Sequence, residues 1–304
     1  MKPLRAPFLI LAAGSSACTA VPSSQPAVAA NAAAEAGRTA LPALTPASAP
    51  LPAGTFTTSG EQTQGGWLRG TAPVGTTRLT LDGKPVELGS DRQFLIAFDR
   101  DAGPVATLLA ERSDGSRVTQ PLQVSKRAWR IENINAARRP GGATDDFMAI
   151  RAPELEAIAA ARALHTDAQG WRQKFVWPAK ARISGLFGSQ RIYRGEPGAY
   201  HSGIDIAPGA GATYVSPADG VVVLAVQGFS LEGNLLIVDH GMGLNSAFLH
   251  SQKLLVKQGD RVRQGQPLGL VGASGRATGP HLHWSLKWQD ARLDPLLFTG
   301  PMPD

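Results

Sequence analysis

Short apolar segments separated by glycine, asparagine and aspartate fill the C-terminal part of the chain, and this spacing constrains the fold more than any other feature. Between about Phe175 and Phe298 they include "GVVVLAV", "NLLIVDHG", "SAFLH" and "HLHWSL". Runs of this length between turn residues are typical of strands, and none shows the period of an amphipathic helix. The 34 glycines and 23 prolines favour the same turn-rich architecture. We therefore predict an all-β domain over residues 175–299.

A second set of strands is predicted nearer the N-terminus, over residues 55–135. The segment "RLTLDGKPVEL" alternates apolar and polar residues around Asp82-Gly83, which is a hairpin pattern. "VATLLAERSDGSRVTQPLQV" gives a further strand pair around Asp114-Gly115. Several short strands at this spacing indicate a small β-sandwich, similar in arrangement to immunoglobulin-like modules. It contains no histidine, so we interpret it as a spacer or binding module.

One helix is expected between the two β regions, within a linker over residues 136–174. "APELEAIAAARAL", residues 152–164, is rich in alanine and glutamate and carries Pro153 near its start. His165 follows this segment and is interpreted as a histidine of the last helical turn rather than a metal ligand.

The N-terminal 20 residues have the pattern of an export signal. Lys2 and Arg5 precede a short apolar run at residues 8–13, and small residues follow. Cys18, the single cysteine of the chain, lies in "SSAC", which resembles a lipoprotein processing site. Lipidation at Cys18 with membrane anchoring, and soluble export, both remain open. Residues 21–54 are mostly alanine, proline and serine and are predicted to form a disordered tether. We expect the protein in the periplasm or cell envelope.

The net charge of +6 suits an anionic polymer as a partner. Nucleic acid, a membrane surface and cell-wall material all carry such charge. The chain shows no lysine-rich run and no platform of stacked aromatic residues, so we predict that it does not bind nucleic acid.

Four residues in two segments point to a metal. In "GPHLHW", His281 and His283 are two apart, so a strand would place both imidazoles on one face. In "YHSGIDIAPG", His201 and Asp205 could meet at one ion if the chain bends at Gly203. Catalytic zinc is characteristically held by three such ligands and keeps a position for water. The fourth residue would then be free to act as an acid or base.

These two segments resemble the lysostaphin/LytM-type zinc metalloendopeptidases, which cut peptides in bacterial peptidoglycan. "HSGIDIA" is followed about eighty residues later by "GRATGPHLHW". The likeness covers residues 180–297 and includes "ISGLFGSQR", "GATYVSPADGVV", "VDHGMGLNSAFLH", "VKQGDRVRQGQPLGLVG" and "LDP". It implies a compact antiparallel β barrel-sandwich with one Zn²⁺ per chain on the floor of a groove.

The resemblance also implies a role for each matching residue. His201, Asp205 and His283 would be the zinc ligands, and His281 would be a catalytic histidine. His250 in "SAFLH" falls where the family has a second catalytic histidine, although the family's preceding tyrosine is a phenylalanine here. His240 in "VDHGMG" is interpreted as a turn residue.

The predicted function is therefore zinc-dependent hydrolysis of peptide cross-links in peptidoglycan. A non-catalytic, LytM-like activator of other cell-wall hydrolases is the alternative. A carrier domain of the lipoyl type is disfavoured, because no lysine stands on a tight hairpin. The sequence leaves open whether His250 or His281 is the general base, and whether the cut falls at a D-alanyl cross-link or a glycine bridge.

Overall fold

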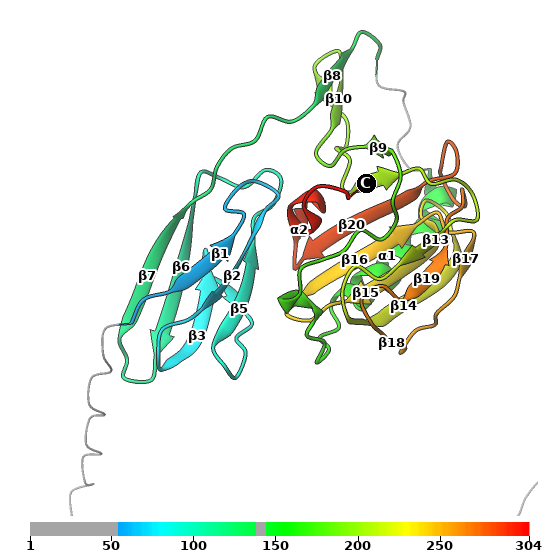
Figure 1. Cartoon of the computed structure of the whole chain (residues 1–304). Coiled ribbons are helices and arrows are strands. Elements are labelled where there is room, and N and C mark those ends of the chain that lie inside the picture. Colours follow the sequence, from blue (N-terminus) through cyan, green and yellow to red (C-terminus); the bar gives the residue numbers. More distant parts are fainter. Residues whose placement is uncertain (1–53, 138–143, 304) are drawn as a thin grey trace, which may run out of the picture. The chain divides into compact units, whose positions relative to one another are not determined.

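The computed structural model describes residues 54–137 and 144–303 (Figure 1). Strands dominate this part of the chain, and the predicted mainly β architecture with few helices is confirmed. The helices within it are α1 (Asp145–Arg162), α2 (Leu296–Thr299) and a 3-10 turn, η1 (Gly170–Arg172). The predicted export signal, Cys18 and all but the last residue of the predicted tether lie outside the described residues.

Two antiparallel sheets form from the strands between residues 57 and 123. One has the order β1-β2-β5 and the other the order β4-β3-β6-β7. Their bounds are β1 Thr57–Gly60, β2 Trp67–Thr71, β3 Thr76–Leu81, β4 Lys84–Val86, β5 Gln93–Ala97, β6 Val105–Arg112 and β7 Arg117–Gln123. The hairpins predicted at Asp82-Gly83 and Asp114-Gly115 are confirmed as β3–β4 and β6–β7. An immunoglobulin-like topology stays a prediction.

An eight-stranded antiparallel sheet carries the C-terminal region. Its order is β18-β14-β15-β16-β20-β12-β9, and β21 also pairs with β20. The bounds are β9 Ile183–Gly185, β12 Ile204–Ile206, β14 Gly220–Phe229, β15 Gly233–Asp239, β16 Leu244–Leu249, β18 Arg261–Val262, β20 Leu282–Trp288 and β21 Ala291–Leu293.

Two small sheets complete the described structure. One contains β13 (Thr213–Val215), β19 (Pro267–Leu270) and β17 (Lys253–Leu254). The other contains β11 (Glu196–Pro197), β10 (Gln190–Tyr193) and β8 (Ile131–Ile134), and its β8–β10 pair is parallel.

The eight-stranded sheet has two different faces because strand side chains alternate. On β20, Leu282, Trp284 and Leu286 are almost fully buried in the main apolar cluster. His283 and its same-face neighbours point the other way. We call the face that carries Trp284 the inner face and the face that carries His283 the outer face. Burial of large side chains on the inner face supplies much of the stability of this region.

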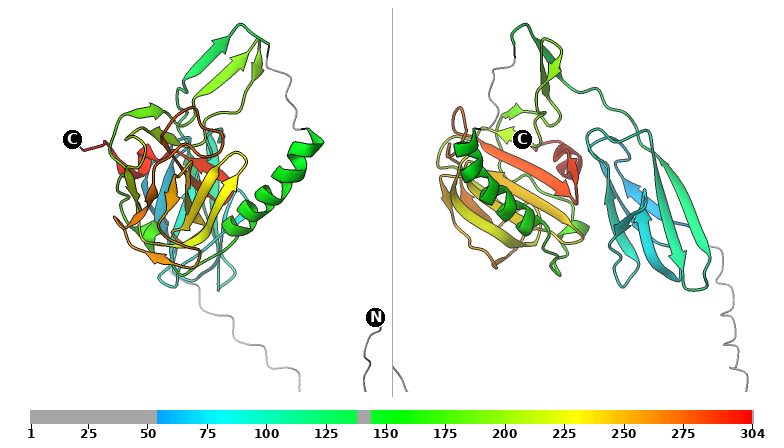
Figure 2. Two further views of the ribbon diagram at one scale, coloured as in Figure 1. Left: turned by 90° about the vertical axis from the view of Figure 1, so that its right-hand side faces the viewer. Right: turned by 180° about the vertical axis from the view of Figure 1, so that it is seen from behind.

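Helix α1 covers part of the outer face (Figure 2). Ile158 and Ala161 pack there in a second apolar cluster with residues of β14, β15 and β16. The predicted bounds, residues 152–164, were wrong at the start of the helix. Thr144 caps the N-terminus by accepting a hydrogen bond from the Phe147 N–H at 3.2 Å, so Pro153 lies inside the helix. The helix was proposed only to link the two β regions, and in the structure it also packs on the eight-stranded sheet.

Candidate metal centre

Strands β12 and β20 bring the three predicted ligands together. Asp205 on β12 pairs directly with His283 on β20 in the antiparallel register. His201 lies just before β12, beyond Gly203. A Cβ on Gly203 would lie 2.4 Å from the Trp284 carbonyl oxygen and 2.8 Å from His283 Nε2, so only glycine fits there. The missing side chain of Gly203 therefore leaves room for the His283 ring.

Three donor atoms converge in this cluster. His201 Nε2 lies 3.1 Å from Asp205 Oδ1 and 3.1 Å from His283 Nδ1, and the last two atoms are 2.9 Å apart. Zinc–ligand distances of about 2.0–2.1 Å in tetrahedral geometry place ligand atoms roughly 3.3 Å from each other. Two imidazole nitrogens and one carboxylate oxygen therefore have the chemistry and the spacing of a zinc site.

The charges within the cluster favour ligand-competent protonation states for Asp205 and His283. For His201, burial lowers the pKa, but the hydrogen bond with Asp205 and the charge of that carboxylate outweigh burial and raise it. Burial raises the pKa of Asp205, but hydrogen bonds with His201 and His283 outweigh it and hold that pKa well below the usual value. Burial lowers the pKa of His283 and so favours its neutral form. An ionised carboxylate and a neutral imidazole are the forms that bind a metal.

His281 and His250 lie beside the cluster. His281 Nε2 is 3.6 Å from Asp205 Oδ1, and the His250 ring centroid is 5.0 Å from that of His281. Each Nδ1 lies 2.8 Å from a backbone carbonyl oxygen, of Gly279 for His281 and of Ser274 for His250. A carbonyl only accepts, so each Nδ1 carries the proton and each Nε2 is left as the basic nitrogen.

His250 has two further features, an unusual backbone conformation and a lowered side-chain pKa. Its backbone φ is 65°, in the left-handed region that residues other than glycine rarely adopt. Burial lowers its pKa, the hydrogen bond with the Ser274 carbonyl opposes this, and repulsion from His281 and His283 lowers it further. A neutral imidazole at this point can accept a proton.

The remaining histidines lie elsewhere. His240 is fully buried, with Nδ1 2.8 Å from the Asp219 carbonyl oxygen and Nε2 2.7 Å from the Ser246 hydroxyl. It is thus a core residue that follows the end of β15. His165 lies beyond the C-cap of α1 and contacts Glu87 at 3.1 Å. Neither contributes to the cluster.

Sequence reasoning missed the groups that orient the five residues. The carbonyl oxygens of Gly279 and Ser274 carry no side-chain signal. Gly185 on β9 was quoted only as part of a resembling segment. A Cβ there would lie 2.4 Å from Asp205 Oδ2, so this glycine leaves room for the carboxylate.

Cavities open on two sides of the cluster. A cavity of about 930 Å³ is lined by His201 and Asp205, and another of about 350 Å³ by His283. A chain that crossed the cluster from one cavity to the other would pass all three donor atoms.

Two histidines and one carboxylate on a β-sheet, with two more histidines beside them, form the type of site found in catalytic zinc proteins. Residues 199–295 match the family model of Peptidase family M23, and this span contains all five residues. The chain therefore carries an M23 peptidase domain of the LytM type, which confirms the resemblance found in the sequence.

Similar proteins include both an enzyme and an activator by name. Peptidoglycan DD-endopeptidase ShyA of Vibrio cholerae is 38% identical over 118 residues, which are 38% of this chain and 26% of ShyA. Murein hydrolase activator NlpD of Escherichia coli is 30% identical over 133 residues, 44% of this chain and 32% of NlpD. The matches thus span about a quarter to a third of these relatives.

Among solved structures, a candidate M23 peptidase from Pseudomonas aeruginosa resembles a larger part of the chain. It has a TM-score of 0.62 and 27% sequence identity, and the match covers 79% of this chain and 96% of that one. The likeness therefore extends beyond the M23 domain itself.

Proposed function

We propose that this protein is a zinc-dependent endopeptidase that hydrolyses peptide cross-links in bacterial peptidoglycan. The observation that carries the proposal is the convergence of His201, Asp205 and His283, with donor atoms 2.9–3.1 Å apart, beside two histidines that present a basic Nε2. The names of M23 relatives such as ShyA support peptidoglycan as the substrate.

One zinc ion per chain would be held by His201 Nε2, Asp205 Oδ1 and His283 Nδ1. When bound, zinc polarises a peptide carbonyl and lowers the pKa of a coordinated water toward neutrality. Asp205 would offset part of the metal charge, and its two histidine contacts fix the orientation of the carboxylate.

His250 and His281 would perform the proton transfers. Hydrolysis adds water across the C–N bond, so one proton leaves the water and one must reach the departing amine. Either Nε2 can accept the first proton, because both Nδ1 atoms are already held by carbonyl oxygens. Once protonated, the same imidazole can donate to the amine nitrogen and stabilise the developing oxyanion.

The cross-link that we favour is a D-alanyl peptide bond rather than a glycine bridge. The name of the similar protein ShyA, a peptidoglycan DD-endopeptidase, supports this choice. Action on the cell wall requires export, in agreement with the sequence pattern of residues 1–20, and Cys18 would add a lipid anchor if it is processed as in lipoproteins. In the described part of the chain, no helix has the length and apolar character needed to cross a membrane.

An activator of other hydrolases is the second candidate, and the similarity to NlpD is the observation that favours it. An activator acts by binding another hydrolase, so its effect would survive loss of the metal. An endopeptidase needs the metal for every turnover.

Asp205→Asn separates the two functions, because it keeps the size of the side chain but removes the charge that holds the metal. We expect a folded protein that lacks zinc by elemental analysis, releases no muropeptides from purified sacculi and does not complement a deletion strain. Asp167→Asn, at an exposed carboxylate paired with Arg261, is the matched control and should behave as wild type. Full complementation by folded, zinc-free Asp205→Asn would refute the enzyme and favour the activator.

A further inference from the structure

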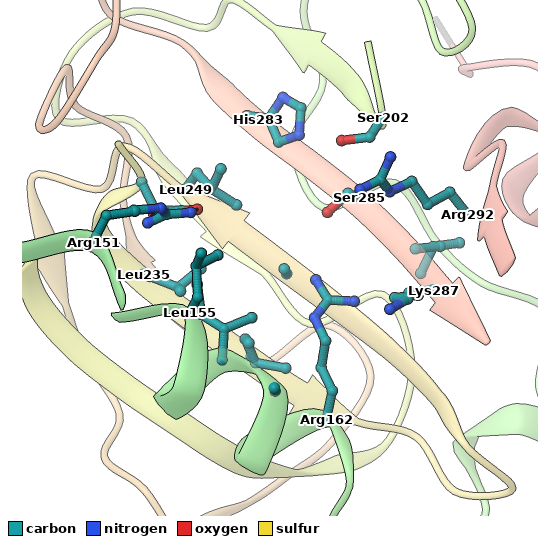
Figure 3. Close-up of a pocket in the computed structure, with 16 residues that line it drawn as sticks. Arg151, Leu155, Arg162, Ser202, Leu235, Leu249, His283, Ser285, Lys287 and Arg292 are labelled. Atoms are coloured by element: carbon teal, nitrogen blue, oxygen red, sulfur yellow. Dashed lines mark hydrogen bonds and ion pairs between the residues drawn. The ribbon is translucent and has the colours of Figure 1, made fainter. Parts of the chain in front are cut away.

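The smaller cavity beside the metal cluster has a basic end. It lies on the outer face of the eight-stranded sheet, between α1 and β20 (Figure 3). His283 lines one part of it, and Arg162, Lys287 and Arg292 gather farther along β20. Its apolar lining comes from the sheet and from α1, and includes Leu155, Ile158, Leu235, Ile237, Ala247 and Leu249.

Strand geometry fixes the distance between the metal cluster and these cations. His283, Ser285 and Lys287 alternate with the inner-face residues of β20 and therefore share the outer face. Each same-face step is about 6.6 Å, so the backbones of His283 and Lys287 lie about 13 Å apart. Arg162 reaches the same place from the last turn of α1, and Arg292 from β21.

The positive charge here is only weakly compensated. Arg162 Nη1 donates to the neutral Asn245 Oδ1 at 3.0 Å, and Lys287 lies 3.9 Å from Asp290, whose side chain is 88% exposed. Among the described residues, no guanidinium nitrogen of Arg162 or Arg292 has a carboxylate oxygen within 4.0 Å. The backbone N–H of Arg292 donates to Asp99 Oδ2 at 2.9 Å, and its guanidinium carbon lies 5.5 Å from the Tyr200 ring centroid. Burial and then repulsion from Arg292 lower the pKa of Arg162 to about 10.

Arg151 lies on α1 like Arg162 and lines the same cavity, but carboxylates compensate its positive charge. Its guanidinium donates to both carboxylate oxygens of Glu232, at 2.6 and 2.7 Å, and to Glu154 at 2.8 Å. The three cations at the other end lack such partners from the described chain. The donors that are not used by Asn245 and Tyr200 are therefore available to an anion that enters the cavity.

We propose that Arg162, Lys287 and Arg292 form a subsite for a carboxylate of the peptide substrate, a few residues from the bond that is cut. The proposal rests on the proposed endopeptidase function and names the substrate feature that this side of the metal cluster selects. An extended peptide advances about 3.3 Å per residue, and the cationic side chains reach back toward His283. The carboxylate would therefore belong to a residue about two to four positions from the scissile bond, with small apolar side chains over the lining between them.

The test uses the full-length, zinc-loaded protein and two synthetic cross-linked peptides. One carries free carboxylates on its acidic residues, and the other has the same carboxylates converted to primary amides. The measured quantity is the ratio of kcat/KM for the two peptides. The ratio of Kd is measured as well, in the His281→Ala background, where the peptides should bind uncut.

We expect wild type to prefer the carboxylate peptide by about 10- to 100-fold, the range for hydrogen bonds to charged groups. Arg162→Gln, which can still donate to Asn245, should bring the ratio close to one. Lys287→Met is a second variant on a different element, in case the helix tolerates the first poorly. Arg263→Gln, at an exposed arginine, removes the same net charge and should keep the full preference.

A wild-type ratio near one, or an unchanged ratio in both Arg162→Gln and Lys287→Met, would overturn the subsite. Failure of wild type to cleave either peptide, together with a preserved Kd preference that Arg162→Gln abolishes, would refute the endopeptidase and leave the subsite standing. Absence of binding to both peptides would refute the subsite as well.

Discussion

The two faces of the eight-stranded sheet are built from the same strands and serve different purposes. On the inner face, Trp284 of β20 and Phe248 of β16 are directly paired and fully buried. On the outer face, their neighbours His283 and Leu249 also pair directly. Both line the smaller cavity, and His283 belongs to the metal cluster. Alternation thus separates residues that stabilise the fold from residues of the candidate metal site, although they are neighbours in sequence. Substitutions on the two faces should therefore have separable effects.

The largest effect is expected for His281→Ala, beside the metal cluster. Loss of a general acid–base group should lower the hydrolysis of sacculi by about 10²–10⁴-fold, equivalent to about 3–5 kcal/mol in the activation free energy. Zinc content and thermal stability should stay close to wild type, because His281 is not one of the three converging ligands. Elemental analysis checks the division of roles, since an empty site in this variant would make His281 a ligand.

On the inner face, Phe248→Ala should show the opposite pattern. Phe248 is fully buried and stacks on Tyr214 with ring centroids 5.3 Å apart. The cavity left behind should lower the free energy of unfolding by about 3–5 kcal/mol in chemical denaturation. The folded fraction should still bind zinc. Leu255→Ala, at a side chain that is 45% exposed, is the control and should change stability little. Equal losses in the two variants would contradict the assignment of the core.

A third difference between the faces should appear at acidic pH. Burial lowers the pKa of His240 from 6.5 to about 4. Between these values the unfolded chain binds a proton that the folded chain does not, so this contribution to stability is present above pH 6.5 and lost as pH falls toward 4. The loss amounts to roughly 3 kcal/mol for this one residue.

Unfolding of wild type and His240→Gln at pH 7 and pH 4.5 measures this contribution directly. The variant should be less stable at pH 7 but should lose less stability on acidification, since it has no group to protonate at this position. Identical losses in the two proteins would show that His240 is not the residue responsible.

The smallest effect is expected at the start of α1, which covers part of the outer face. Thr144→Ala removes the side chain that caps the helix and should lower the free energy of unfolding by about 1 kcal/mol. Thr144→Ser keeps the hydroxyl and should recover most of this loss. Hydrogen exchange of the first turn of α1 would locate the effect, and protection unchanged in the alanine variant would argue against the cap.

Much of the fold was accessible from sequence because its signals are local. Short apolar runs and Asp-Gly pairs predicted the strands and the hairpins at Asp82-Gly83 and Asp114-Gly115. The start of α1 was not predicted, because Pro153 was taken as a marker of the first turn. In the structure the capping side chain of Thr144 begins the helix two turns earlier, and the proline is accommodated within it.

The candidate site was predictable to the level of residue types and spacing. Two histidines at alternate positions predict two imidazoles on one face of a strand. The glycine between His201 and Asp205 predicts a bend that brings these two side chains together. The tautomers of His250 and His281 depend on carbonyl oxygens of the backbone, which the sequence does not distinguish. Likewise Arg162 and Lys287 line one cavity only because α1 packs across the sheet, and no local sequence pattern predicts that packing.

The alternation of side chains between the two faces of the sheet along β20 also determines where the chain can tolerate insertions and deletions. Removing one residue from this strand shifts every later side chain to the opposite face. Trp288, now buried against the core, would turn outward, and the ammonium group of Lys287 would be driven into the apolar interior. Length variants of this protein should therefore be recovered in the loops that flank β20, whereas within the strand sequence change should be confined to substitutions that keep its length.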